Sequence, residues 1–186
     1  MLYAEIVDAV EKIRKRYNED DPFRLCRAMG IILLPQPLGR EEGAIKGFFL
    51  QRSRIRTITY NSDLPEVFQR IIVGHEIGHA QLHAKNGVHA FHDAGMFDMS
   101  SRYEKEANLF AAEYLLKDDE VLESLNADNT FFSAASALRV PFELLDCKFR
   151  AMKWKGYKLV EPPITARSNF LRDVEVPFDA DEFDAC

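Results

Sequence analysis

The feature that most constrains this chain is a helical pattern that carries two histidines four residues apart. The segment after residue 63 has residues at helical spacing that share one face of the predicted helix: Phe68, Ile71, Ile72, His75, His79 and Leu82. Residues at i and i+4 lie one above the other on a helix, so both imidazoles can reach one zinc ion. Glu76 directly follows His75 and can take a proton from a water molecule that the zinc activates. The stretch His-Glu-Ile-Gly-His therefore predicts a catalytic metal site. Asp63-Leu64-Pro65-Glu66 has the form of a capping box and predicts where the helix begins.

A catalytic zinc site needs a third protein ligand and leaves its fourth position to water. His83 is two helical turns from His75, about 12 Å along the axis, and two ligands that are each about 2 Å from one ion cannot be that far apart. We expect His83 to be a packed histidine or a partner of a ligand. His89 and His92 fall in a long loop, where we expect them to face solvent.

The third ligand is expected from the next helix, over residues 102–116. At about 100° per residue, one face is small and largely apolar and comprises Glu104, Ala107, Asn108, Ala111 and Leu115. The opposite, charged side comprises Glu106, Glu113 and Lys117. A carboxylate that faces the core needs a partner, and a metal supplies one. Glu104 is therefore the predicted ligand, and the alternative for it is a capping box with Ser101.

Two further roles have candidates in the sequence. Metal-bound histidines usually donate their other ring N–H to an oxygen, and Asn108, one turn past Glu104, could accept it. The alternative for Asn108 is an ordinary surface asparagine. The group that stabilises the oxyanion has three candidates, Tyr60, His83 and Tyr103.

The remaining patterns predict an α+β fold. We expect a helix over 4–17, a short helix from Asp21-Pro22 to Gly30, a buried strand at 31–34, a hairpin of 43–50 and 54–60, and two or three short helices within 118–155. These elements give a small antiparallel sheet beside two crossed helices that hold the zinc, with additional C-terminal helices. Residues 54–60 are expected to offer an edge to an extended substrate. We expect a metallopeptidase domain over 1–125 and a helical extension with an acidic tail over 126–186.

Composition excludes several classes of protein. The 186 residues carry a net charge of −6, which argues against direct binding of nucleic acid through positive charge. No apolar run is long enough to span a membrane, and the acidic N-terminus does not resemble a signal peptide. Three distant cysteines indicate no disulfide framework, so we expect a cytoplasmic protein. Residues 134–149 faintly resemble a helix-turn-helix, but their low positive charge favours a packing role.

Two motifs together resemble the ImmA/IrrE family of zinc metallopeptidases. The first is Gly-His-Glu-Ile-Gly-His-Ala-Gln-Leu-His over residues 74–83, preceded by residues 56–60 and 68–70. The second runs from Glu104 to Leu116 and has the form Glu-x-x-Ala-Asn-x-Phe-Ala, ending in two leucines. Lys117-Asp118 stand where the family usually has Met-Pro, which leaves the metal set untouched. The resemblance implies that His75, His79 and Glu104 bind the metal and that Glu76 is the catalytic base.

The resemblance also implies a zincin-like fold and a substrate. Members of that family are typically cytoplasmic proteins of bacteria and phages that cleave helix-turn-helix repressors and so release genes of mobile elements or of a stress response. The alternative is a metal-dependent sensor that captures a transcription factor without cutting it. Glu76 favours the enzyme, because a sensor has no evident use for a base beside its metal. Zinc is the expected cofactor, although two histidines and a glutamate also accept other divalent ions.

Overall fold

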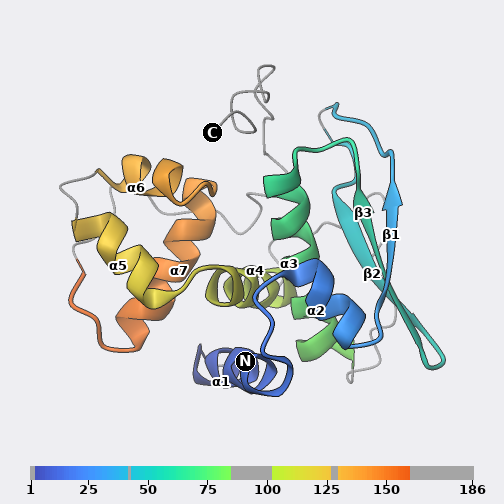
Figure 1. The fold of residues 1–186 in the computed structure, drawn as a ribbon, viewed down its shortest axis with the longest axis horizontal. Helices are drawn as coiled ribbons and strands as arrows, with labels where there is room; N and C mark the ends of the chain where they lie inside the picture. The colour runs from blue at the N-terminus through green and yellow to red at the C-terminus, as the bar shows by residue number, and fades with distance from the viewer. Residues whose placement is uncertain (1–2, 42, 85–101, 127–129, 160–186) are drawn as a thin grey trace.

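The computed structural model describes residues 3–41, 43–84, 102–126 and 130–159 (Figure 1). Its helices and strands are, in chain order, α1 Tyr3–Tyr17, α2 Pro22–Ala28, β1 Ile32–Gln36, β2 Gly47–Arg52, β3 Ile55–Asn61, α3 Glu66–Leu82, α4 Arg102–Leu115, α5 Asp118–Asn126, α6 Phe131–Ala137 and α7 Phe142–Trp154. The predicted α+β class is confirmed. None of the described helices is long and apolar enough to cross a membrane.

The sheet has three strands in the order β1-β3-β2. The predicted hairpin is present, with β2 and β3 antiparallel, but β1 pairs parallel to β3, so the sheet is mixed rather than antiparallel. The chain reverses after β1 and again in the hairpin, and two reversals make the first and third strands parallel. The expectation that residues 54–60 offer a free edge is wrong, because β3 lies between the other two strands.

The first strand is more exposed than the sequence suggested. Ile32 and Leu34 are 51% and 39% exposed, although an apolar run at this point predicted a buried strand. β1 is an edge strand, so one of its sides has no neighbouring strand among the described residues. Ile31, immediately before the strand, is buried in the core.

The start of α3 also differs from its prediction. Asp63 does not cap the helix: its carboxylate accepts a hydrogen bond from the backbone N–H of Gly39 at 2.8 Å. Pro65 occupies the N-cap position without a side-chain hydrogen bond, and the helix begins at Glu66. The carboxylate of Asp63 therefore binds the loop after β1, through Gly39, instead of capping the helix that follows it.

Helices α3 and α4 cross at close range because α3 carries glycine at the crossing. A Cβ atom built on Gly78 would lie 3.1 Å from the Cα of Ala107 and 3.2 Å from its carbonyl oxygen. Such distances are tighter than ordinary contacts between carbon atoms. The pairing of a glycine on α3 with an alanine on α4 brings the two backbones together beside the predicted metal ligands.

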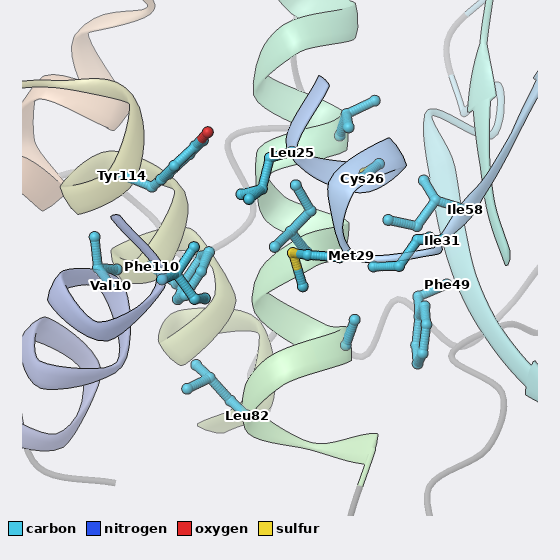
Figure 2. Close-up of a cluster of buried hydrophobic side chains, with 14 of the residues drawn as sticks. Val10, Leu25, Cys26, Met29, Ile31, Phe49, Ile58, Leu82, Phe110 and Tyr114 are labelled. Atoms are coloured by element: carbon cyan, nitrogen blue, oxygen red, sulfur yellow. The ribbon is translucent and has the colours of Figure 1, made fainter. Parts of the chain in front are cut away.

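The hydrophobic residues form two buried clusters that share α4. The first packs α1, α2, the sheet and α3 around α4, and Figure 2 labels ten of its members: Val10, Leu25, Cys26, Met29, Ile31, Phe49, Ile58, Leu82, Phe110 and Tyr114. The second joins α4 to α5, α6 and α7, which lie on the side of α3 and α4 away from the sheet (Figure 1). Helix α4 is therefore enclosed from several directions.

The C-terminal helices α5–α7 form as predicted, and residues 134–149 lie in α6, α7 and the turn between them. Their side chains Leu144, Leu145 and Phe149 are buried in the second cluster. Lys148 is fully buried and pairs with Glu113 of α4, at 2.8 Å, and with Asp118. The positive charge of Lys148 is therefore neutralised by these two carboxylates and does not reach the surface, where it could contact phosphates. The division of the chain at residue 125 stays a prediction.

Candidate metal centre

Three side chains from the two crossed helices meet at one point. Nε2 of His75 lies 3.0 Å from Nε2 of His79, and both come from consecutive turns of α3. The carboxylate of Glu104, from the first turn of α4, places Oε2 3.1 Å from the His75 nitrogen and Oε1 3.2 Å from the His79 nitrogen. These three residues form a cluster that could hold a metal ion.

The cluster has the size and chemistry of a zinc site. Groups about 2 Å from one zinc ion in tetrahedral directions lie roughly 3.3 Å apart, close to the separations observed here. The side chains are buried, with His75 4%, His79 1% and Glu104 9% exposed. Two imidazole nitrogens and one carboxylate are donors that zinc prefers, and they leave a fourth position open.

The protonation states of the cluster also suit a cation. Burial lowers the pKa of His79 to about 4, so its ring is neutral at pH 7. Burial alone would raise the pKa of Glu104, but its close contacts with the His75 and His79 rings hold it well below its usual range. A metal requires neutral imidazoles and an ionised carboxylate, which His79 and Glu104 supply. Burial alone would lower the pKa of His75, but Glu104 and Glu76 raise it, so a metal would have to displace any proton that this ring carries.

Glu76 lies beside this cluster and faces β2. It is 4% exposed, its carboxylate hydrogen-bonds the backbone of Phe49, and its Oε2 has no partner among the described residues. Burial raises the pKa of Glu76 to about 7, although the charge of His75 lowers it in part. The strand can approach this closely because residue 47 is glycine. A Cβ atom at this position would lie 2.5 Å from a methyl carbon of Ile72, which is too close, and 3.7 Å from Oε1 of Glu76. A buried carboxylate with a pKa near neutrality is suited to accept and release a proton.

His75 is held from behind by Asn108. Its Nδ1 lies 2.8 Å from the amide oxygen Oδ1 of Asn108, one turn past Glu104 on α4. Because an amide oxygen only accepts, His75 donates its Nδ1–H and keeps the Nε2 lone pair for the cluster. The asparagine is 2% exposed, so it is not a surface residue.

His83 lies behind the other histidine and contributes no atom to the cluster. It is fully buried, with Nδ1 3.0 Å from Nδ1 of His79 and Nε2 3.0 Å from Oε2 of Glu106. Burial lowers the pKa of His83. The ring of Tyr103 packs edge-on against His83, with centroids 4.8 Å apart.

The prediction that Glu106 lies on a charged, solvent-facing side is wrong. Glu106 is 6% and Glu113 2% exposed, because α4 is surrounded by α1, α3 and α7 and has no wide solvent face. The sequence held a signal for this: the run from Leu109 to Leu116 is apolar on several sides of the helix, which is typical of a buried helix.

Of the other candidates, Tyr60 has a ring contact with another element, and the rest lie outside the described residues. Tyr60 packs its ring edge-on against Phe23 of α2, with centroids 5.4 Å apart, and burial raises its pKa. His89, His92 and Ser101, the alternative partner of Glu104, are outside the described residues.

Comparisons with known proteins agree with this arrangement. A sequence model of the Peptidase M78 family, described as the IrrE N-terminal-like domain, matches residues 26–150. A relative from Bacillus phage phi105, named "Uncharacterized immunity region protein 2", is 34% identical over 146 residues, which cover 78% of this chain and 90% of the relative. No solved structure matches the chain.

Proposed function

The chain belongs to the Peptidase M78 family, and from this we propose that it is a zinc-dependent endopeptidase that cleaves a helix-turn-helix transcriptional repressor. The observation that carries the proposal is the buried cluster of His75, His79 and Glu104 with Glu76 beside it. A peptidase that acted on a repressor would release the genes that the repressor silences, such as those of a mobile element or a stress response. It would work in the cytoplasm, where such repressors bind DNA.

His75, His79 and Glu104 would hold the metal in this proposal. A zinc ion bound there supplies a Lewis acid, which makes water more acidic and polarises the carbonyl of a peptide bond. The fourth position left by the three ligands is where water and substrate would meet it. Other divalent ions fit the same donors, so the choice of zinc is part of the proposal.

Glu76 would move the proton. Its Oε2, for which the described residues offer no hydrogen-bond partner, would accept a proton from the attacking water and then deliver it to the nitrogen of the departing amine. The backbone hydrogen bond from Phe49 holds the carboxylate against β2 during both steps. A group that stabilises the oxyanion is not assigned: the ring contacts of Tyr103 and Tyr60 are with His83 and Phe23.

The substrate would bind along β2 rather than along β3. β2 is an edge strand of the sheet, and its Gly47 and Phe49 both approach Glu76. An extended peptide that adds to this edge would make main-chain hydrogen bonds with β2. Its scissile bond would then pass the carboxylate of Glu76.

The proposed substrate class rests on the relative and the family. The phage relative is named as an immunity region protein, and the two motifs resemble a family whose members typically cleave helix-turn-helix repressors. The net charge of −6 supports recognition of a protein rather than direct binding to DNA.

The alternative is a sensor that captures the repressor without cutting it. A sensor needs the three metal-binding residues but not a base. The buried Oε2 of Glu76, which has no hydrogen-bond partner within the described part of the chain, therefore supports the enzyme. The test is incubation of the zinc-loaded protein with candidate helix-turn-helix repressors, first with any that is encoded beside its gene, followed by mass spectrometry of the products.

Glu76→Gln should abolish cleavage while the protein keeps its zinc. Glu66→Gln is the matched control, because it removes one carboxylate from an exposed position of the same helix. A Glu76→Gln protein that still cleaves would contradict the proposed base. A protein that inactivates the repressor without any cleavage, with or without Glu76, would establish the sensor.

A further inference from the structure

A buried chain of hydrogen bonds leads away from the metal centre behind His79. Its first two links, His79 Nδ1 to His83 Nδ1 and His83 Nε2 to Glu106 Oε2, are each 3.0 Å long. Nε of Arg102 then donates to Oε1 of Glu106 at 2.7 Å. Only Arg102, with 73% of its side chain exposed, reaches solvent, whereas the His83 and Glu106 side chains are 0% and 8% exposed.

The chain fixes the position of each proton, starting from its outer end. The carboxylate of Glu106 is an acceptor, so the nitrogen of His83 that faces it, Nε2, carries the hydrogen. A neutral imidazole has one N–H, which leaves Nδ1 of His83 as an acceptor. His79 therefore donates its own Nδ1–H to His83. The Nε2 lone pair of His79 is left pointing toward His75 and Glu104.

We propose that Glu106 is a positioning residue for the metal: acting through His83, it holds His79 in the tautomer that presents Nε2 to the ion. The inference rests on the proposed zinc site, which it extends by assigning a role to a residue that is not a ligand. Two of the carboxylates of α4, those of Glu104 and Glu106, thus act on opposite sides of one imidazole. Glu104 faces Nε2 of His79, and Glu106 controls Nδ1 through His83.

The two histidine ligands are held in different ways. Asn108 contacts His75 directly with a neutral amide, whereas the support of His79 ends in a carboxylate that Arg102 also binds. Hydrogen bonds to charged groups are stronger than those between neutral groups. Groups that hold a ligand histidine from behind typically change metal affinity by about ten- to a hundredfold. Glu106 should therefore matter as much for metal affinity as a direct partner does.

A merely structural role for Glu106 makes a different prediction. Its pair with Arg102 joins residues four apart on α4 and could serve only to stabilise the first turns of that helix. Loss of such a pair would lower the stability of the metal-free protein. It would not change the tautomer of His79 or the affinity for metal in a protein that remains folded.

The direct test is a long-range ¹H–¹⁵N spectrum of the zinc-loaded protein labelled with ¹⁵N-histidine. The proposal predicts that His79 carries its hydrogen on Nδ1 and that His83 carries it on Nε2. A spectrum in which the hydrogen of His83 is on Nδ1 would overturn it. This measurement uses the unaltered chain, so it does not depend on the folding of a variant.

The second test compares zinc affinities by competition with a chelator. Glu106→Gln should bind zinc about ten- to a hundredfold more weakly, while the same substitution at the exposed Glu120 leaves the affinity unchanged. Circular dichroism of the metal-free variants checks that both are folded. If Glu106→Gln binds zinc as tightly as the unaltered chain, the proposal fails while the zinc site stands. An unaltered chain without zinc affinity would contradict the zinc site itself and this inference with it.

Discussion

Nδ1 of His75 lies 2.8 Å from the amide oxygen of Asn108, across the crossing of α3 and α4. The contact joins a candidate metal ligand on one helix to a residue one turn past Glu104 on the other. It fixes the ring of His75 with Nε2 toward His79 and Glu104, and the helix crossing thereby becomes part of the metal centre.

Asn108→Ala is expected to weaken zinc binding by roughly ten- to a hundredfold, because the ring of His75 loses the oxygen that orients it. Chelator competition measures the change. Asn108→Asp is the informative control, since its carboxylate oxygen can still accept the Nδ1–H of His75. If the alanine variant binds zinc as tightly as the unaltered chain, the contact does not orient His75.

Gly78→Ala tests the close approach of the two helices. The new Cβ atom would press on the backbone of Ala107, and such overpacking costs about 1–3 kcal/mol, against about 1 kcal/mol gained from helix propensity. We expect a net loss of roughly 1 kcal/mol in the free energy of unfolding, measured with urea, together with weaker zinc binding as Glu104 moves away.

Gly74→Ala is the matched control for this change. Its Cβ atom would meet the side chain of Leu115 at 3.1 Å, and a flexible side chain can move where a backbone cannot. The alanine at residue 74 should therefore be tolerated. Equal losses from the two substitutions would show that the helix crossing is not the sensitive point.

Asp118 should make stability depend on pH. Burial alone would raise its pKa, but hydrogen bonds from Lys148 and Lys155 lower it below the usual 3.8. A lowered pKa in the folded state contributes stability that is present above pH 3.8 and is lost as pH falls through the folded pKa. Urea unfolding of the metal-free protein from pH 6 downward should show this loss.

Asp118→Asn should remove that part of the acid dependence, so the variant and the unaltered chain should approach each other in stability at the lowest pH. Glu123→Gln, an exposed carboxylate of the same helix, serves as the control and should leave the acid dependence unchanged. A constant stability difference between the Asp118→Asn protein and the unaltered chain at all pH values would contradict the role of Asp118.

Local patterns predicted the parts of the site that depend on one helix. The spacing of His75 and His79 needs only helical periodicity, and the direction of Glu104 follows from its angle to Asn108 on α4. The burial of Glu106 depends on which helices enclose α4, and those neighbours are distant in the sequence. An angle around one helix identifies opposite faces, but it does not say which face is covered.

The sheet illustrates the same limit. The hairpin of β2 and β3 was predictable because its two strands are adjacent in the sequence. The parallel pairing of β1 depends on how the chain returns after residue 36, and nothing local determines it. The role of Asp63 was also not predictable from local sequence. Its carboxylate, which could have capped α3, instead accepts a hydrogen bond from the backbone N–H of Gly39.

In the proposed site, His75, His79 and Glu104 bind one zinc ion. Glu76 acts as the base beside the ion and is not one of its ligands. The most direct measurement is the zinc content of three proteins, each loaded with zinc and then dialysed: the unaltered chain, Glu76→Gln and Glu104→Gln. The unaltered chain and Glu76→Gln should each retain about one zinc ion per chain, and Glu104→Gln should retain almost none, because it loses a charged ligand. Full zinc content in a folded Glu104→Gln protein, or none in the unaltered chain, would contradict the account.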